Sequence, residues 1–208
     1  MSNMFALVES GSITQFPKGN LGITLNNVQY PPTIYTLWSE SERNAIGIYT
    51  VEIDTTNLKN EEYYTNTNIT YTFGSGKVTG TYGTATAKKI TDTLWTSQDK
   101  TDGKIPDGED VGDVAIKGLK TVKKNSINNQ CEGILKNSDW RVVKATETGD
   151  AMDSGWKTYR ASVRTKCNSM QTQIDNASDV DALAALFIYT KQGDGSITRP
   201  LGEFPEKE

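Results

Sequence analysis

The sequence predicts an α+β fold, with a small antiparallel β-rich N-terminal domain followed by a C-terminal helical hairpin or three-helix module. In the first part of the chain, short runs rich in Thr, Tyr and Val alternate with Gly, Asn and Pro turns, as expected for antiparallel strands. In the second part, apolar side chains recur every three or four residues, as expected for amphipathic helices. The predicted organisation is a β-rich domain at 1–88, a linker at 89–112, a helical module at 113–190 and a flexible tail at 191–208.

Three turn signals divide the β-rich domain into hairpins. Ser10-Gly11-Ser12 separates two short strands within residues 4–16. Asn26-Asn27 indicates a two-residue hairpin turn, because Asn tolerates positive φ. Gly74-Ser75-Gly76 lies at the turn of a longer hairpin over residues 63–86. These turns predict a mainly antiparallel domain.

A short helix interrupts this series of strands. Ser39 and Glu42 fit a capping box, in which the first residue is the N-cap and the second lies three residues on. Gly47 suits the C-terminal cap of this helix. Residues 48–53 then return to the period of two that is typical of a strand.

The clearest helical pattern lies in the C-terminal half, in a helix expected from about Asp153 to Ala177. One side of it is formed by residues at spacings of three and four: Trp156, Arg160, Val163, Cys167, Met170 and Ile174. An earlier helix, expected from Val111–Asp113 to about Asn137, carries a shorter apolar stripe: Ile127, Cys131, Ile134 and Leu135. Two such stripes joined by a polar connection predict an αα-hairpin whose apolar faces bury each other.

Other signals modify this helical module. Gly118 and Gly133 are expected to weaken the earlier helix, since Gly is a poor helix former. Asp179 is expected to cap a third helix over 180–189. Trp140 and Trp156 flank the polar connection and are expected to close the end of the bundle.

Composition excludes several classes of function. The 208 residues carry a net charge of −4, which does not favour nucleic acid by bulk electrostatics. No apolar run approaches the roughly 20 residues that a spanning helix needs, so we expect no membrane insertion. The N-terminus lacks a basic segment and reaches Glu9 too early for a secretory signal. We therefore expect the protein to stay in the compartment where it is made, unless it leaves as part of a particle.

Candidate chemistry is sparse. Histidine is absent, which removes the commonest general base and a common metal ligand. The acidic pairs lie in caps, turns and loops and are expected to be solvated: Glu40/Glu42, Glu61/Glu62 and Glu109/Asp110. The acidic segment 102–110 does not have the spacing of an EF-hand loop. We predict no enzyme activity, no catalytic residue, no cofactor and no metal site.

Three further groups of residues are candidate sites. Cys131 and Cys167 are expected to be buried free thiols rather than a disulfide or a reactive site, and their mutual contact is open. Scattered aromatic residues could stack on sugars or bases, although core or interface roles are favoured: Trp38, Trp95, Trp140, Trp156, Tyr63, Tyr64 and Tyr71. A helical lysine stripe without interleaved aromatics is expected to be a solvated face or to meet an acidic partner: Lys117, Lys120, Lys123 and Lys124.

Two stretches resemble proteins of tailed bacteriophages. Ile134-Leu135-x-x-Ser138-Asp139-Trp140, followed by Trp156-x-x-Tyr159-Arg160-x-x-Val163-Arg164, resembles a helical module of tail-fibre assembly proteins and related tail-associated proteins. The N-terminal Met4-Phe5-Ala6-Leu7-Val8-Glu9-x-Gly11-x-Ile13, with Gln29-Tyr30-Pro31 and Trp38-Ser39, is similar to the opening of such proteins. The resemblance covers about half of the chain.

This resemblance implies a non-enzymatic tail-associated protein that acts by protein–protein contacts. It would serve in tail-fibre assembly or remain as a virion tail or fibre adaptor, with fibre or baseplate proteins as partners and a homo-oligomer as a further option. The implied location is the host cytoplasm during assembly, or the virion tail. The module's signature positions, which we expect to bind partners or pack the module, are Trp140, Trp156, Tyr159, Arg160 and Arg164. From the residues themselves, Arg160 is expected to pair with a nearby carboxylate such as Asp139. The alternative function is a glycan-binding host-recognition module that uses Tyr and Trp residues of the β-rich domain.

Overall fold

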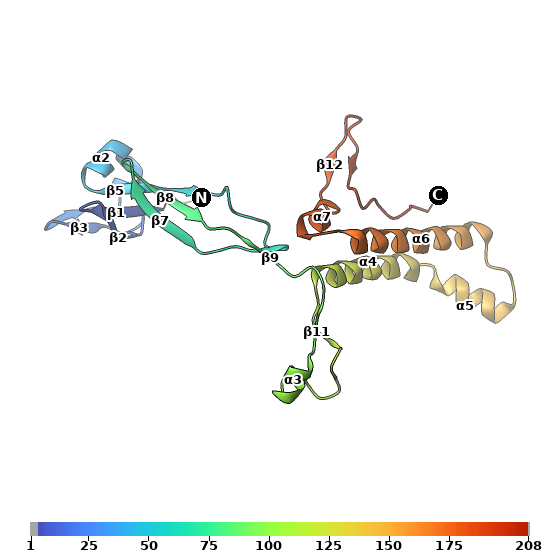
Figure 1. The fold of residues 1–208 in the computed structure, drawn as a ribbon. Helices are drawn as coiled ribbons and strands as arrows, with labels where there is room; N and C mark the ends of the chain where they lie inside the picture. Colours follow the sequence, from blue (N-terminus) through green and yellow to red (C-terminus); the bar gives the residue numbers. More distant parts are fainter. Residues whose placement is uncertain (1–3, 208) are drawn as a thin grey trace. The chain divides into compact units, whose positions relative to one another are not determined.

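The computed structural model describes residues 4–207 of the chain. These residues fall into two compact units, within Met1–Thr86 and Ala87–Glu208. Strands dominate the first unit and helices the second (Figure 1), which confirms the predicted α+β class. Residues 1–3 lie outside the described residues. They belong to the predicted β-rich domain and to the N-terminal segment for which no secretory signal is predicted. Glu208, the last residue of the predicted tail, also lies outside the described residues.

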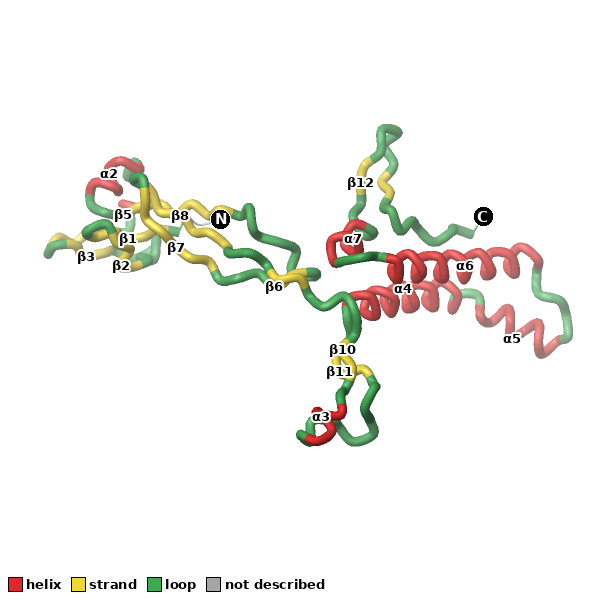
Figure 2. The backbone as a smooth tube through the Cα atoms, viewed as in Figure 1, coloured by secondary structure: helices red, strands yellow, loops and turns green. Residues whose placement is uncertain are grey.

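In its described residues, the first unit contains one five-stranded sheet, two two-stranded ribbons and two short helices (Figure 2). Its elements are β1 (Phe5–Glu9), β2 (Ser12–Gln15), β3 (Ile23–Leu25), β4 (Val28–Tyr30), α1 (Ile34–Leu37), α2 (Glu40–Ala45), β5 (Ile48–Asp54), β6 (Tyr64–Thr65), β7 (Ile69–Gly74), β8 (Lys77–Tyr82) and β9 (Thr86–Ala87). The sheet has the order β2-β1-β5-β8-β7, while β3 pairs with β4 and β6 with β9.

One strand pair departs from the predicted antiparallel pattern. β5 runs parallel to β8, with Val51 opposite Val78 and Asp54 opposite Thr81. A parallel pair needs a crossover connection, which here includes β6 and β7. Local turn signals predict hairpins but carry no information on such a non-local pair. The other sheet pairs are antiparallel, as predicted.

The predicted turns are confirmed, and their backbone conformations explain the residues used. Asn26 and Asn27 both have positive φ, 49° and 65°, in the β3–β4 turn. Ser75 and Gly76, at 52° and 76°, form the β7–β8 turn. The capping box of α2 is also present: Ser39 Oγ accepts from Glu42 N, and the Glu42 carboxylate accepts from Ser39 N at 2.7 Å.

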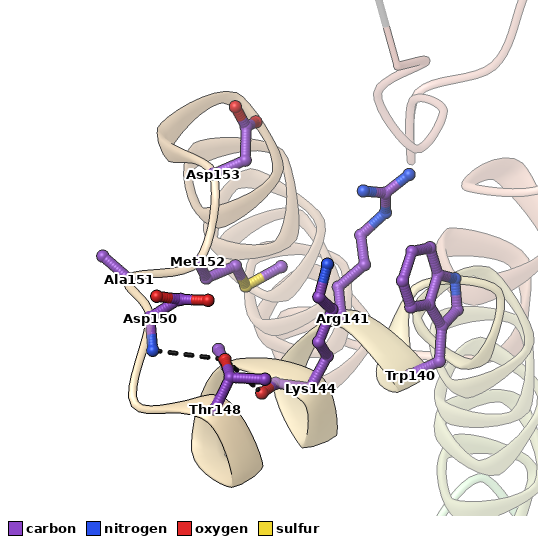
Figure 3. A pocket seen from close by; sticks show the side chains of 9 residues that line it. Trp140, Arg141, Lys144, Thr148, Asp150, Ala151, Met152 and Asp153 are labelled. Carbon is purple, nitrogen blue, oxygen red and sulfur yellow. Dashed lines mark hydrogen bonds between the residues drawn. The ribbon is translucent and has the colours of Figure 1, made fainter.

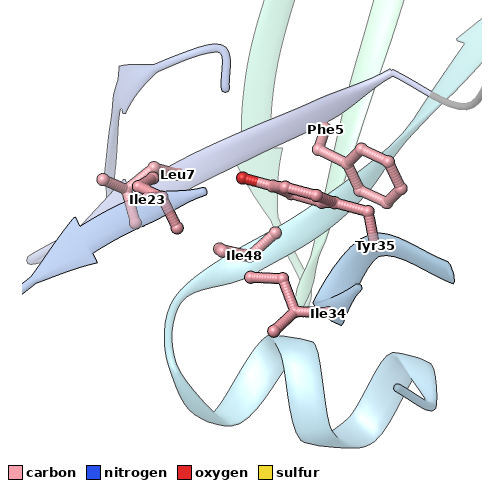
Figure 4. Packing of buried hydrophobic residues seen from close by; sticks show 6 residues of the cluster. All are labelled: Phe5, Leu7, Ile23, Ile34, Tyr35 and Ile48. Carbon is pink, nitrogen blue, oxygen red and sulfur yellow. The ribbon is translucent and has the colours of Figure 1, made fainter. Parts of the chain in front are cut away.

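β1 alternates its side chains between two cores, one on each face of the sheet. Phe5 and Leu7 point to one face, where they pack with four other buried residues (Figure 4): Ile23, Ile34, Tyr35 and Ile48. Ala6 and Val8 point to the other face and pack with Val51 and Val78. Both faces of β1 are therefore buried, and the strand reads as a continuous apolar run.

The two edge strands of the sheet approach each other. The Phe16 ring, just after β2, lies 4.7 Å from the ring of Tyr71 on β7, measured between centroids. Tyr71 also packs against the Val51–Val78 core. The sheet is consequently curled toward a partly closed barrel, which reduces the exposure of its edges.

The second unit is built around a pair of long helices. Its elements are β10 (Thr93–Leu94), α3 (Ser97–Thr101), β11 (Val114–Ile116), α4 (Leu119–Lys136), α5 (Asp139–Thr148), α6 (Ser154–Asn176), α7 (Val180–Ala185), β12 (Thr190–Lys191) and β13 (Ile197–Thr198). α4 and α6 lie side by side as the predicted αα-hairpin (Figure 1). The predicted apolar face of α6 is buried at Arg160, Val163, Cys167, Met170 and Ile174.

The predicted linker at 89–112 and the predicted start of the first long helix differ from the structure. Residues 92–116 form an arm in which β10 pairs with β11 and α3 lies at the tip. No residue of this arm is buried. Its sequence therefore lacks the periodic apolar pattern from which its strands and helix could have been predicted. α4 begins only at Leu119, because residues 114–116 are committed to the β10–β11 ribbon.

The arm is fastened to the start of α4 by Asp92 and Gly118. The Asp92 carboxylate accepts from the Gly118 N–H at 2.7 Å and from the Thr121 hydroxyl at 2.9 Å. The N–H groups of Leu119 and Lys120 donate to the carbonyls of Lys89 and Ile90. These contacts satisfy the amide groups that the first turn of a helix leaves without partners. Gly118 is thus the N-cap of α4 rather than an interior residue that weakens it.

The Asp92 cap of α4 makes the free energy of unfolding depend on pH in the acid range. The hydrogen bond from Gly118 and then that from Thr121 hold the pKa of Asp92 below its usual range. Its contribution to stability is therefore fully present above the unfolded-state pKa of about 3.9 and is lost as the pH falls through the lower folded-state pKa. We expect Asp92→Asn to lower the free energy of unfolding at pH 7 and to differ progressively less from the wild type below about pH 4. Urea denaturation from pH 7 to pH 2 measures this; a difference that does not depend on pH would contradict it.

The predicted polar connection between the long helices contains a further helix, α5. None of its residues is buried, and Gly149 ends it with φ of 73°. The third predicted helix is shorter than expected: α7 ends at Ala185, although Asp179 caps it as predicted, accepting from Ala182 N at 2.8 Å.

The predicted flexible tail at 191–208 also has structure. β12 and β13 form a hairpin, after which Leu201 is fully buried. Leu201 N donates to the Leu186 carbonyl, and Lys166 Nζ donates to the Leu201 carbonyl at 3.1 Å. Through Leu201, the tail therefore contacts α6 and the end of α7. The polar composition of the tail does not predict these contacts.

Candidate functional site

Arg160 joins the three helices at the distal end of the helical hairpin. Its side chain is 6% exposed and donates to three oxygens: the Leu135 carbonyl at 2.7 Å, Ser138 Oγ at 2.6 Å and the Asp139 carboxylate at 2.7 Å. The pairing of Arg160 with Asp139 that the sequence predicted is present. Leu135 lies at the end of α4, Asp139 begins α5 and Arg160 is on α6, so one planar guanidinium ties three chain segments together.

The junction contains one buried hydroxyl group, that of Ser138, which is a partner of Arg160. It is fully buried, donates to the Leu135 carbonyl at 2.9 Å and accepts from Arg160. A buried arginine is tolerated only where its donors have partners, and the Leu135 carbonyl and Ser138 hydroxyl supply them. The carbonyls at a helix C-terminus also attract a cation, which favours the guanidinium at the end of α4.

A second contact on the same junction stacks an arginine between two tryptophans. The guanidinium carbon of Arg141 lies 4.4 Å from the ring centroid of Trp140 and 4.3 Å from that of Trp156. The Trp156 ring meets the Tyr159 ring edge to face, with centroids 5.9 Å apart. Cation–π contacts of this kind hold α5 against α6 although α5 buries no residue of its own.

The structure brings four of the five predicted site residues into this junction. Trp156, Tyr159 and Arg160 are on α6, and Trp140 is on α5. Trp140 remains 55% exposed, so it borders the end of the hairpin rather than closing it. Arg164 is exposed, one turn further along α6, and donates to the Arg160 carbonyl at 3.4 Å. Arg141 was not predicted, because its contact with Trp156 depends on the bend between α5 and α6.

A cavity of about 310 Å³ lies beside this stack, between α5 and the start of α6 (Figure 3). Trp140 and Arg141 stand on one side of it, with Lys144 beside them and Asp150 and Met152 across from them. Asp153 also lines it, but this carboxylate caps α6 by accepting from Trp156 N at 3.0 Å. The cavity therefore combines an exposed aromatic ring with two cations, Arg141 and Lys144, and two carboxylates, Asp150 and Asp153.

Two properties of the Cys, Asp and Glu side chains in residues 4–207 bear on acid–base and metal chemistry. This part of the chain contains no group of three or more Cys, Asp or Glu side chains placed to hold a metal ion. Among these residues, where the pKa of a carboxyl group departs from its usual range, hydrogen bonds lower it. For Asp99, the largest cause is the hydrogen bond from the Thr96 hydroxyl. A general acid near neutral pH needs a raised pKa instead.

Among residues 4–207, no helix has the length and apolar character needed to cross a membrane.

The two cysteines meet across the α4–α6 interface. Cys131 and Cys167 are both buried and free, and their thiols share a hydrogen bond. Cys167 Sγ also lies 3.4 Å from the amide nitrogen of Gln171, which donates to it. Burial, followed by the hydrogen bond and the charge of Cys167, raises the pKa of Cys131 to about 11. This environment disfavours the thiolate that a nucleophilic or metal-binding cysteine needs.

Thiol labelling provides a direct test. With a pKa of about 11, only about 0.1% of Cys131 is thiolate at pH 8. We expect iodoacetamide to label Cys131 at least a hundredfold more slowly in the native protein than in the urea-unfolded chain, as followed by mass spectrometry of its peptide. Comparable native and unfolded rates would show that the α4–α6 interface is open.

Comparison with known protein-family models, curated proteins and solved structures gives no match to this chain.

Proposed function

We propose that the chain is a non-enzymatic, tail-associated protein of a tailed bacteriophage that acts through protein–protein contacts. The observation that supports this most is the helical junction. Residues that carry the phage resemblance hold one segment of chain against another there: Arg160 binds three oxygens, and Trp140 and Trp156 both contact Arg141, which is not part of the resemblance. Such a site offers a rigid surface and no activated nucleophile.

Within this proposal the protein either assists tail-fibre assembly in the host cytoplasm or stays in the virion as an adaptor. The partners would be fibre or baseplate proteins. Trp140 is the signature residue best placed to reach them, because it is 55% exposed and borders the cavity. Arg160, which is buried, would act only by shaping this surface.

Mass spectrometry of purified particles of the phage that encodes the chain tests the proposal, together with affinity purification of the tagged protein from infected cells. An adaptor is expected in the particles in a fixed ratio to a tail protein. An assembly factor is expected to be absent from particles but to copurify with a fibre or baseplate subunit. If it is absent from both, the proposal is wrong.

The alternative is a glycan-binding host-recognition module in the β-rich part of the chain. It would need flat, exposed aromatic side chains. Tyr63 is buried, while Trp38 and Tyr71 pack against the two cores of the first unit. These positions give the alternative less support than the tail-assembly proposal. Binding of the isolated protein to a host-surface polysaccharide would favour the alternative.

A further inference from the structure

The arm of residues 92–116 is ordered without a core of its own. Its tip is held by polar contacts, including the Trp95 indole on Glu109, Lys100 on Asp110 at 2.8 Å and the capping box of Thr96 with Asp99. An isolated two-stranded ribbon is marginally stable in water unless something covers one face. The arm therefore has the character of an element that is completed by a partner.

The ribbon carries three exposed apolar side chains. Leu94 pairs with Val114, and Ile116 lies two residues further along the same strand. Their side chains are 47%, 40% and 67% exposed. Around these residues the arm carries seven carboxylates and two lysines, a net charge of −5, against −4 for the whole chain. Its partner should thus present a basic rim around an apolar centre, and the arm of a second copy would be repelled.

The area that the chain exposes is larger than two compact units need. Units of 86 and 122 residues should together expose about 11,500 Å². The protein exposes 13706 Å², an excess on the order of 2,000 Å². In a head-to-tail contact each chain uses two different patches, which together bury about 1,600 Å² per chain at standard interface size. The excess is of the right size for such an assembly.

Among the described residues, the surface around α5 suits the arm. Residues 1–86 carry a net charge of −3 and would repel it. The lysines of α4 are occupied: Lys120 binds the Asp175 carbonyl, Lys124 binds its carboxylate and Lys123 lies over the Phe187 ring. By contrast, segment 136–164 has a net charge of +2 and exposes Trp140 and Val143, at 55% and 53%. Trp140 also lines the cavity, together with Lys144, with Arg141 stacked on two tryptophans, and with the carboxylates of Asp150 and Asp153.

We propose that the arm of one copy of this chain docks on the α5 surface and its cavity in a second copy, with Ile116 as the apolar anchor. The contact must form between copies. The arm leaves the N-terminal end of α4, whereas α5 follows its C-terminal end, about 27 Å away over 18 residues. Such a contact joins two different patches and closes into a ring or continues as a chain. The proposal stands apart from the phage assignment, because it involves no protein other than this one.

Sedimentation velocity of the purified full chain over 1–100 μM tests this. We expect reversible association that weakens when salt is raised from 50 to 500 mM, since the rim contacts are ionic. Ile116→Ser and Lys144→Glu should each weaken association at least tenfold. The matched control is Leu37→Ser in the first unit, which removes an even more exposed leucine, at 77%, and should change nothing.

Charge exchange identifies the two surfaces. Asp107→Lys on the arm should weaken association, and combining it with Lys144→Glu should restore part of it. Cross-linking of mixed light and heavy isotope-labelled chains should join Lys100 or Lys104 of one copy to Lys144 of another. A protein that stays monomeric at 100 μM and low salt would overturn the proposal, as would association that survives Ile116→Ser or cross-links that place the contact elsewhere. These results would leave the phage assignment untouched.

Discussion

Arg160→Ala is expected to destabilise the helical unit by about 3 kcal/mol. The substitution removes a buried guanidinium and leaves the Ser138 hydroxyl and the Leu135 carbonyl without one of their partners inside the protein. Most of the cost is desolvation of these two groups, because the third partner, Asp139, is 56% exposed and can be solvated again. Urea denaturation followed by helical circular dichroism measures the change.

Two variants separate the role of geometry from that of charge. Arg160→Lys keeps the charge, but its single ammonium nitrogen cannot occupy the positions of both Nη1 and Nη2, so we expect an intermediate loss of about 1–2 kcal/mol. Arg164→Ala removes an exposed arginine one turn away and should cost about 0.5 kcal/mol or less. If Arg160→Ala and Arg164→Ala have equal effects, Arg160 does not organise the junction.

Gly118→Ala should be destabilising by about 3 kcal/mol, opposite in sign to the usual effect of replacing a helical glycine. A Cβ atom at this position would overlap the carbonyl group of Thr91 and lie 2.8 Å from Asp92 N. The backbone atoms that it meets are those of the segment that carries the cap of α4, so relief of the overlap must break the hydrogen bonds of Asp92. We expect a lower free energy of unfolding and faster amide exchange in the first turn of α4.

Gly133 provides the control for this prediction. It lies inside α4 with ordinary helical φ and with open space where a Cβ would be placed. Gly133→Ala should therefore stabilise the protein by about 0.5–1 kcal/mol, through helix propensity alone. A stabilising Gly118→Ala would mean that the close approach of Thr91 to α4 is not maintained in solution.

The parts of the fold that could be predicted are those with local signals. The buried face of α6, the capping box of α2 and the Asn26-Asn27 turn each depend on residues a few positions apart. The arm could not be predicted, since it buries nothing and so carries no periodic pattern. The parallel β5–β8 pair could not be predicted either, because its partners are joined by a long crossover.

The same distinction holds within the junction. The sequence predicts that the stem of Arg160 covers the bundle and that its charge pairs with a nearby carboxylate such as Asp139, and this pair is present. The position of Arg141 between Trp140 and Trp156 arises from a bend that no sequence pattern marks. The tail-associated function stays a prediction that the particle experiments test.

The parallel pairing of β5 with β8 also has a consequence for synthesis on the ribosome. Until residue 77 and those after it emerge, β5 has a neighbour on one side only, and its other edge is open. The edge of β5 stays unpaired while the residues between β5 and β8 are synthesised, and pairings between distant segments form slowly. The sheet is therefore the step most exposed to misfolding, whereas the α4–α6 hairpin forms from neighbouring segments. Slowing translation after residue 54 should lengthen the life of the open edge and reduce the yield of folded protein.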